Sequence, residues 1–345
     1  MSGKLIIDVK NVRENISKIK SQCKGSLFCG VVKANCYGVG IGLCAHLYDL
    51  VDYWAVANTR EAKELAKISD KPILVLSPLS YLELSDTDIY KQRNIEYAID
   101  SIDVLKHLIK HKRSISIHIA VNTGMNRYGV DYAIFTKMLH MLSKQRYVLL
   151  KGVFSHFYSC RQEDMDNQYK RFIMFADKAK KQYKDVICHI SNSAGLAYNL
   201  DMVRVGIAMY GTADTDCISL ESEVKAVRCV NKGENISYNA HFAAEKDMRV
   251  AVIPLGYADG IMRRYGGGCV LINGKACPVV GDICMDCFMV DISLVDDVQV
   301  GDCVTIIGKS DKLSVNICQI ATKCDTINYE VISRLGSRIE RIYKN

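Results

Sequence analysis

The segment GVVKANCYGVG (30–40) places a lysine at the end of a short apolar run and a tyrosine four residues later. A lysine ammonium is strongly hydrated and is rarely buried, so Lys33 is unusual at the exit of a strand that is apolar on both faces. A lysine that is desolvated among other cations has a lowered pKa and can form a Schiff base with a carbonyl group. Lys33 is therefore the first candidate for covalent chemistry.

Other polar side chains follow apolar runs later in the chain: Asn122 and Arg127 in NTGMNRYG, His156 in SHF, His189, Asn192 and Ser193 in HISNSAG, and Arg204 before Gly206 and Ile207. Hydroxyl groups and backbone N–H groups near helix starts suit a phosphate, so Ser193 and the Gly206 and Ile207 amides are candidate phosphate ligands. No acidic ligand set accompanies these cations, which favours a small anionic ligand over a metal ion. A Schiff-base lysine beside a phosphate site suggests pyridoxal 5′-phosphate.

These candidates require a scaffold that brings the ends of many strands together. Eight short apolar runs alternate with charged segments of helical period, and the runs lie at 27–34, 53–58, 72–78, 95–100, 115–122, 149–157, 186–191 and 203–211. Continuous apolar strands indicate a sheet that is covered on both faces, as in parallel sheets with crossover helices. Eight strand–helix units predict an α/β fold, a (β/α)8 TIM barrel, whose functional residues gather at the C-terminal ends of the strands.

The pattern changes near residue 217, where helical periods stop. Strand-like segments with Gly and Asn turns follow, and INGK (272–275) has the Asn-Gly pair of a type I′ hairpin. The sequence therefore predicts a barrel domain over 1–217 and a mostly antiparallel β domain over 218–345. The first strand is a candidate member of the second domain.

The composition excludes several function classes. The chain has 345 residues, 49% of them hydrophobic and 24% charged, and no apolar run approaches the roughly 18 residues of a membrane span. The N-terminus lacks a signal-peptide pattern, which predicts a cytoplasmic protein without a membrane segment. The net charge of +7 comes from dispersed basic residues, which argues against nucleic-acid binding. The 15 cysteines are scattered and are expected to be reduced core residues rather than zinc ligands.

Several motifs occur in the order found in alanine racemases, which are pyridoxal 5′-phosphate enzymes of fold type III. They are VVKANCYGVG, NTGMNRYG, SHF, SNSAG, RVGIAMYG, SYNA, PLGYADG and VGDICMD, and they span nearly the whole chain. The chain resembles this family closely. The resemblance implies a (β/α)8 barrel, a β-rich C-terminal domain that contributes to the partner's active site, and a homodimer that supplies D-amino acids for peptidoglycan precursors.

The resemblance also implies roles for individual residues. Racemisation removes the Cα proton from one face and returns a proton to the other, so two bases on opposite faces suit it. By resemblance, Lys33 holds the cofactor and is one base, and Tyr238, in SYNA, is the other, donated by the second subunit. Arg127 resembles the residue that meets the substrate carboxylate, and His156 the histidine beside the cofactor ring.

The remaining residues of the implied site bind the cofactor or line the entry channel. Arg204 resembles the arginine that hydrogen-bonds the pyridine nitrogen, with His189 behind it. The other cofactor-binding residues are Tyr37, Asn192, Ser193, Gly206 and Ile207. The partner-contributed rim of the substrate channel corresponds to Tyr257, Met285 and Asp286.

Two departures from the family pattern concern the substrate. Many relatives carry a carbamylated lysine in a KxDTG segment, where this chain has Ala120 and Asn122, so the negative charge that would orient the arginine is missing. Ser337 stands where a tyrosine is usual, and the SRLGSR run is similar to the serine racemases of glycopeptide-resistance clusters. The sequence therefore predicts activity on alanine and serine, with a serine-preferring enzyme of a resistance pathway as the alternative.

Two further interpretations belong to other classes. A pyridoxal-phosphate-dependent decarboxylase would need a glycine-rich phosphate loop and a C-terminal cysteine–acid pair, and neither arrangement is present in the sequence. A non-catalytic pyridoxal-phosphate-binding protein of the single-barrel type would end after the barrel, whereas this chain continues with the segment that contains Tyr238. His118, which has no motif around it, is interpreted as a core histidine.

Overall fold

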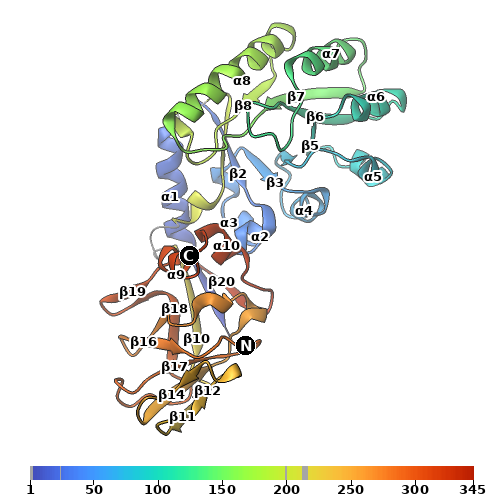
Figure 1. The fold of residues 1–345 in the computed structure, drawn as a ribbon. Helices are drawn as coiled ribbons and strands as arrows, with labels where there is room; N and C mark the ends of the chain where they lie inside the picture. Colours follow the sequence, from blue (N-terminus) through green and yellow to red (C-terminus); the bar gives the residue numbers. More distant parts are fainter. Residues whose placement is uncertain (1–2, 24, 199, 212–216) are drawn as a thin grey trace. The chain divides into compact units, whose positions relative to one another are not determined.

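The computed structural model describes residues 3–345 except 24, 199 and 212–216 (Figure 1). The chain forms two compact units. The barrel unit contains Ile16–Ala34 and Cys44–Gly206, and the C-terminal unit contains Met1–Asn15, Asn35–Leu43 and Ile207–Asn345. The domain boundary predicted near residue 217 stays a prediction, because each of the two units contains segments that are not consecutive in the sequence.

Within its described residues, the barrel unit is built on an eight-stranded sheet in the order β8-β7-β6-β5-β4-β3-β2-β9. All its strand pairs are parallel. The Asp201 and Arg204 N–H groups donate to the carbonyls of Cys188 and Ser191, which links the β9 edge to the β8 edge. The strands are β2 (Leu27–Val31), β3 (Tyr53–Val56), β4 (Ile73–Val75), β5 (Ile95–Ile99), β6 (Ile115–Ala120), β7 (Val148–Phe154), β8 (Ile187–His189) and β9 (Met202–Val205).

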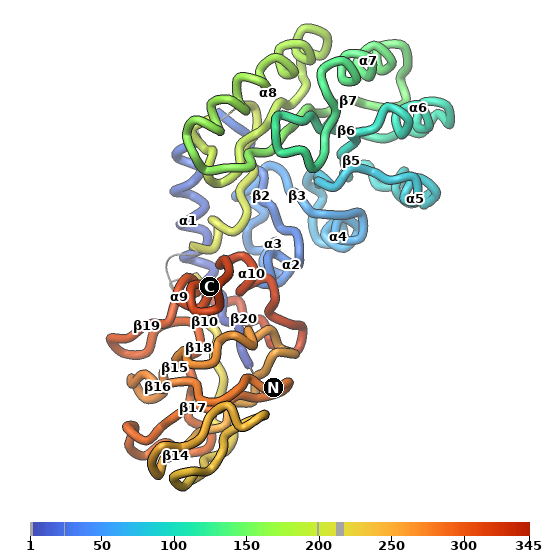
Figure 2. The backbone as a smooth tube through the Cα atoms, viewed as in Figure 1, coloured from blue at the N-terminus to red at the C-terminus, as the bar shows by residue number. Residues whose placement is uncertain are grey.

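These strands coincide with the eight apolar runs, so the predicted barrel is confirmed. Every residue of β3, β4 and β5 is buried, which explains why the runs are continuous rather than alternating. Figures 1 and 2 show the longer helices around the outside of the strands. The helices of this unit are α3 (Leu43–His46), α4 (Thr59–Leu65), α5 (Tyr81–Leu84), α6 (Ile102–Lys110), α7 (Tyr132–Leu142) and α8 (Gln162–Gln182). The first residue of α3 belongs to the C-terminal unit, and α1 (Val9–Gln22) begins in that unit and ends in the barrel unit.

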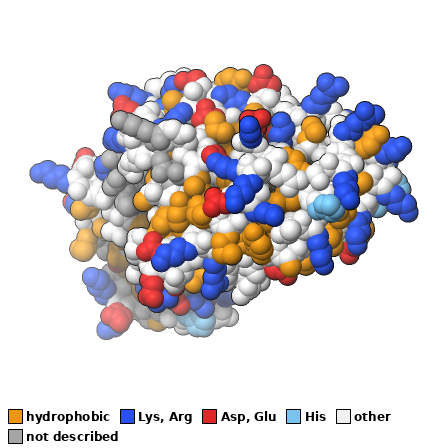
Figure 3. Space-filling view, turned by 90° about the horizontal axis from the view of Figure 1, so that it is seen from above, with side chains coloured by type: hydrophobic (Ala, Val, Ile, Leu, Met, Phe, Trp, Pro, Cys, Tyr) orange, Lys and Arg blue, Asp and Glu red, His pale blue; other side chains and the backbone are white. Residues whose placement is uncertain are grey.

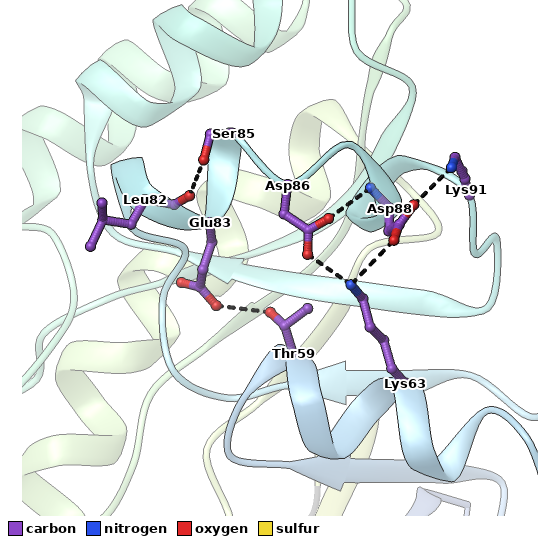
Figure 4. A network of polar contacts seen from close by, with 8 residues as sticks. All are labelled: Thr59, Lys63, Leu82, Glu83, Ser85, Asp86, Asp88 and Lys91. Atoms are coloured by element: carbon purple, nitrogen blue, oxygen red, sulfur yellow. Dashed lines mark hydrogen bonds and ion pairs between the residues drawn. The ribbon is translucent and has the colours of Figure 1, made fainter.

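The connection from β4 to β5 is a surface segment, α5 followed by the short helix η2 (Thr87–Tyr90). Figure 4 shows Lys63 of α4 in contact with Asp86 and Asp88. Its Nζ lies 2.7 Å from the Asp86 carboxylate and 3.9 Å from that of Asp88. Thr59 donates to Glu83 at 2.8 Å. These contacts are partly exposed and join neighbouring helices, so we interpret them as structural.

The C-terminal unit contains a ten-stranded sheet that is mostly antiparallel. β1 pairs in parallel with β20 and antiparallel with β10, so the first strand belongs to this sheet. Asn273 and Gly274 have φ of 49° and 71°, as a type I′ hairpin requires, and the predicted hairpin between β15 and β16 is confirmed. The strands are β1 (Lys4–Asp8), β10 (Ile218–Glu223), β11 (Ala226–Val230), β14 (Met248–Ile253), β15 (Cys269–Ile272), β16 (Lys275–Val280), β17 (Phe288–Asp291), β18 (Cys303–Ser310), β19 (Leu313–Val315) and β20 (Glu340–Lys344).

Smaller elements complete the C-terminal unit: the two-stranded sheet of β12 (Asn235–Ile236) and β13 (Phe242–Ala243), the turn α2 (Lys33–Tyr37, which begins in the barrel unit), and the helices α9 (Ile317–Lys323) and α10 (Asn328–Ser333).

Basic side chains are dispersed among acidic and apolar ones on the face drawn in Figure 3. Among the described residues, no helix combines the length and apolarity needed to cross a membrane.

Candidate functional site

Five predicted site residues of the barrel unit interact with one another, and we call Lys33, Arg127, His156, His189 and Arg204 the barrel-end cluster. They lie at or just beyond the C-terminal ends of β2, β6, β7, β8 and β9. Lys33 is half-buried. Burial lowers the pKa of its amine below the ordinary value, and the positive charge of Arg127 lowers it further, while Glu61 opposes this change. A lysine amine in such surroundings is more readily deprotonated than a surface lysine.

The backbone after Lys33 is strained. Ala34, Asn35, Cys36 and Tyr37 have φ between 51° and 55°, so α2 is a turn of left-handed helix. Each such residue costs roughly 1–2 kcal/mol, and the conformation persists only where surrounding contacts enforce it. One enforcing contact is Glu61, whose carboxylate accepts from the Ala34 N–H at 2.9 Å and from the Ala57 N–H at 2.8 Å.

Glu61 was not predicted from the sequence as a residue of the site. The signal that could have found it is the helix-start pattern Asn58-x-x-Glu61, in which Asn58 caps α4 and accepts from the Glu61 N–H. The pattern identifies a helix start. The second hydrogen bond of Glu61, to the segment that follows the lysine, depends on which strands are neighbours in the barrel.

Arg204 is almost fully buried, with 3% of its surface exposed. Its Nη2 donates to the carbonyls of Ser155 at 2.7 Å and Ile190 at 3.2 Å and lies 3.4 Å from His156 Nδ1. Its Nη1 contacts His189 Nδ1 at 2.5 Å and the His189 carbonyl at 3.3 Å. Burial lowers the pKa of Arg204 to about 10, so the guanidinium remains charged at neutral pH. Among the described residues, these contacts leave its Nε–H without an acceptor.

His156 and His189 are held neutral. Burial, together with the charges of Arg204, Arg127 and Lys33, lowers the pKa of His156 to about 3. Burial and Arg204 lower the pKa of His189 well below its ordinary value. The ring of His189 stacks on Phe154 with an interplanar angle of 7°. Both imidazoles are therefore uncharged, rigidly placed hydrogen-bonding groups.

The loop that carries Arg127 is tied to the end of β7. The Thr123 and Ser155 hydroxyls are 2.8 Å apart, and Gln168 donates to Thr123 at 2.9 Å and to the His156 carbonyl at 3.0 Å. Asn122, predicted to affect specificity, accepts from the Gly124 N–H at 2.9 Å and the Asn126 N–H at 3.2 Å. Asn122 therefore shapes its own loop.

Arg127 itself is exposed, and its guanidinium lies 5.5 Å from the centre of the Tyr128 ring. Ala120 is buried at the end of β6. Within the described part of the chain, no hydrogen bond or ion pair orients the Arg127 guanidinium. This arrangement leaves a cation beside Lys33 that is available to an anionic ligand.

The predicted phosphate ligands lie in three segments. Asn192 accepts from the Ala194 and Gly195 N–H groups at 3.1 and 3.2 Å, and it donates to the Phe157 carbonyl, so it shapes the turn in which half-buried Ser193 lies. Gly206 directly follows β9 in the barrel unit, and Ile207 begins the helix η4 (Ile207–Tyr210) of the C-terminal unit.

Tyr37 lies in the C-terminal unit, where it is 8% exposed. Its ring makes edge-on contacts with Tyr210 and Tyr329, at centroid distances of 6.3 and 6.0 Å. The next residue, Gly38, has φ of 87°, and a Cβ there would lie 2.1 Å from the Ile332 carbonyl oxygen. The segment after the lysine is therefore packed closely against the end of the chain.

The remaining predicted residues lie in the C-terminal unit and are exposed; we call Tyr238, Tyr257, Met285, Asp286 and Ser337 the C-terminal group. Tyr238 is 64% exposed. Its neighbours Ser237, Asn239 and Ala240 have positive φ. Asp282 holds this strained segment, because its carbonyl accepts from the Ser237 hydroxyl at 2.7 Å and its carboxylate lies 3.1 Å from His241.

The structure brings several members of this group together. The Tyr257 N–H donates to the Cys284 carbonyl and the Ala258 N–H to the Met285 carbonyl, both at 3.0 Å. Arg338, next to Ser337, donates to Asp286 at 2.8 Å. It also binds the fully buried Asp259 through two hydrogen bonds of 2.7 and 2.9 Å. The PLGYADG, VGDICMD and SRLGSR motifs thus form one surface.

His118 is fully buried, so its interpretation as a core histidine is confirmed, but its hydrogen-bonding partners were not predicted from the sequence. His118 Nε2 lies 2.7 Å from Glu96 Oε2, and its Nδ1 lies 3.0 Å from Nε2 of His189. The available signal was an acidic residue in β5, a strand whose every residue is buried. A buried carboxylate requires partners, so Glu96 alone predicted a polar network.

Comparisons with known proteins agree with the fold and motifs. The family model described as alanine racemase, N-terminal domain, matches residues 7–214, and the model described as alanine racemase, C-terminal domain, matches residues 217–343. The chain is 34% identical to an alanine racemase of Clostridium tetani, over 98% of this chain and 94% of the relative. It is 32% identical to that of Francisella tularensis subsp. novicida, over 98% of each chain.

Solved structures give the same result. An alanine racemase of Clostridium difficile 630 superposes with a TM-score of 0.91 at 30% identity, covering 100% of this chain and 96% of that one. An alanine racemase of Bacillus anthracis with bound L-Ala-P superposes with a TM-score of 0.90 at 28% identity, covering 100% and 95%.

Proposed function

Because this chain belongs to the alanine racemase family, we propose that it interconverts L- and D-alanine with pyridoxal 5′-phosphate as its cofactor. The observation that carries the proposal is the barrel-end cluster, in which a lysine with a lowered pKa lies among two arginines and two neutral histidines. When bound, pyridoxal 5′-phosphate supplies an electron sink that acidifies the Cα–H of an attached amino acid.

The residues present fit this cofactor. Lys33 supplies a half-buried amine for covalent attachment. Arg204 retains one N–H without an acceptor among the described residues, which suits the ring nitrogen, and neutral His156 suits a place beside the ring. The hydroxyl of Ser193, the Gly206 and Ile207 amides, Asn192 and Tyr37 are the proposed phosphate-binding groups. Arg204 stays charged at neutral pH and would donate to the ring nitrogen, which would then stay unprotonated; this would weaken the electron sink and suppress side reactions.

The proposed reaction uses two bases. Lys33 takes or returns the Cα proton on one face, and its lowered pKa favours the neutral amine that this step requires. Tyr238 of a second copy serves the opposite face. Its exposure, together with that of Met285 and Tyr257, supports a homodimer, because large exposed apolar and aromatic side chains that cluster on one surface favour a protein partner.

Arg127 is the proposed partner of the substrate carboxylate, because it is an exposed cation beside Lys33. Ser337 is small and exposed, which leaves room for a hydroxymethyl group and supports serine as a second substrate. Ala120 and Asn122 are the other proposed specificity positions. We place the reaction in the cytoplasm, where it would supply D-amino acids for peptidoglycan precursors.

The test is formation of D-alanine and D-serine from the L-amino acids by the full chain with added pyridoxal 5′-phosphate. We expect both products, with D-alanine lost in Lys33→Ala. The matched control is Lys67→Ala, which removes an exposed lysine paired with Glu64 on α4 and should retain activity. Activity that survives in Lys33→Ala, or a wild-type chain that forms no D-alanine, contradicts the proposal.

A further inference from the structure

Two buried titratable side chains of the barrel unit have no part in the reaction proposed above. Glu96 is 5% exposed and His118 is fully buried. Burying a carboxylate without partners is costly, and such groups are found where they are hydrogen-bonded or paired with a cation. Glu96 therefore requires an explanation beyond the packing of β5.

Glu96 is the end of a continuous chain of hydrogen bonds that begins at Arg204. Arg204 contacts Nδ1 of His189, and Nε2 of His189 lies 3.0 Å from Nδ1 of His118. Nε2 of His118 lies 2.7 Å from Glu96, and Tyr53 donates to the same carboxylate at 3.2 Å. Five side chains from β3, β5, β6, β8 and β9 thus form one buried relay.

The chemistry of its two ends fixes the direction of this relay. A guanidinium can only donate, so Nδ1 of His189 accepts and carries no proton. A neutral His189 then has its proton on Nε2 and donates to Nδ1 of His118, which places the His118 proton on Nε2, facing Glu96. An ionised carboxylate only accepts, so every contact from Arg204 to Glu96 joins one donor to one acceptor.

We infer that Glu96 and His118 are positioning residues that act through His189 to fix the orientation of Arg204 toward the cofactor ring nitrogen. The inference deepens the proposed function and rests on it for the role of Arg204. The carboxylate holds both imidazoles in one tautomer, and it balances the guanidinium charge across two neutral rings. A buried carboxylate that orients a functional imidazole is a known device in enzymes.

The surroundings of the relay support a rigid arrangement. The ring of Phe154 stacks on His189 and lies 5.6 Å from the Arg204 guanidinium. Burial raises the pKa of the neighbouring Cys29 thiol to about 12, so this group stays neutral. Cys29 therefore supplies no negative charge beside Arg204, and Glu96 is the carboxylate of the relay.

The first experiment measures the protonation of the ring nitrogens directly. Long-range ¹H–¹⁵N correlation spectra of the full chain, labelled at histidine and free of cofactor, distinguish protonated from unprotonated nitrogens. We expect His189 and His118 to carry protons on Nε2 and none on Nδ1. A proton on His189 Nδ1 overturns the inference, and this readout does not depend on racemase activity.

The second experiment separates the charge of Glu96 from its capacity to accept hydrogen bonds. In Glu96→Leu the His118 Nε2–H loses its acceptor. We expect the half-saturating concentration of pyridoxal 5′-phosphate to rise and kcat to fall, each on the order of tenfold, with a smaller change in KM for L-alanine. Glu96→Gln keeps an acceptor oxygen and should fall between Glu96→Leu and the wild type.

The control for these variants is Glu64→Leu, which makes the same substitution at an exposed residue of α4. Glu96→Leu with wild-type cofactor saturation and kcat overturns the inference. If Glu96→Leu does not fold, Glu96→Gln and the wild-type spectra still decide it. A wild-type chain that binds no cofactor would contradict the proposed function while leaving the tautomer measurement interpretable.

Discussion

The barrel-end cluster and the C-terminal group differ in how their residues are held. Arg204 and His189 are 3% and 0% exposed, and several hydrogen bonds from neighbouring strands fix them. Tyr238 is 64% exposed and lies in a strained segment, in which the Ser237 hydroxyl donates to the Asp282 carbonyl. The barrel unit therefore fixes its polar groups by contacts within itself, whereas the C-terminal group presents its residues at a surface.

The largest expected effect would test the exposed side of this contrast. Tyr238→Phe removes the proposed base of the opposite face while keeping the ring, and kcat for alanine racemisation should fall by about 10²–10⁴-fold. The matched control is Tyr81→Phe, which removes the hydroxyl of another exposed tyrosine, on α5. An unchanged kcat in Tyr238→Phe would show that Tyr238 has no catalytic role.

A second test compares two glycines of the C-terminal unit that have the same backbone conformation. Gly38 and Gly233 have φ of 87° and 86°, but only Gly38 has close neighbours, because a Cβ added there would lie 2.1 Å from the Ile332 oxygen. Gly233→Ala should cost about 1–2 kcal/mol, and Gly38→Ala about 2–5 kcal/mol because a steric clash is added. Urea unfolding followed by circular dichroism measures both, and equal losses would refute the close packing of the segment that carries Tyr37.

A third test concerns the pH dependence that burial gives the barrel-end cluster. The pKa of His156 is about 3 in the folded protein, below the ordinary value of 6.5, so the unfolded chain binds more protons between these values. His156 therefore does not lower the free energy of unfolding above pH 6.5. As the pH falls from 6.5 toward 3, the free energy of unfolding decreases by at most about 1.4 kcal/mol per pH unit because of this group.

His156→Asn should flatten this part of the stability profile, because asparagine does not titrate. The exposed His140→Asn is the control and should leave the profile unchanged. Unfolding midpoints between pH 4 and pH 8, measured in one denaturant, compare the variants. Parallel profiles for His156→Asn and the wild type would contradict the burial of a neutral imidazole at this position.

The fold was predictable because burial on both faces leaves a pattern in the sequence. Eight continuous apolar runs identified the eight strands, and the Asn-Gly pair identified the hairpin between β15 and β16. Candidates such as Lys33 and Arg204 were found because a charged residue next to a buried strand is conspicuous. Their proposed roles came from the resemblance to a family and stay predictions.

The supporting residues were harder to predict because their contacts depend on strand neighbours rather than on spacing. Glu61, Glu96 and His118 each bind a group from another strand or loop, 27, 22 and 71 positions away in the sequence. No local pattern specifies such a pair. A charged residue within a fully buried strand indicates only that a partner exists. The order of the strands in the barrel then identifies that partner.

The smallest expected effect concerns the surface of the barrel unit. Lys63 pairs with Asp86 at 2.7 Å, and both side chains are partly exposed, at 29% and 42% (Figure 4). Solvent screens such pairs, so Lys63→Met should lower the free energy of unfolding by no more than about 1 kcal/mol and leave racemase activity unchanged. Urea unfolding and a D-alanine assay measure both. A large loss of activity would show that the α4–α5 surface influences Lys33 through Glu61, which lies two residues before Lys63 and binds the backbone next to the lysine.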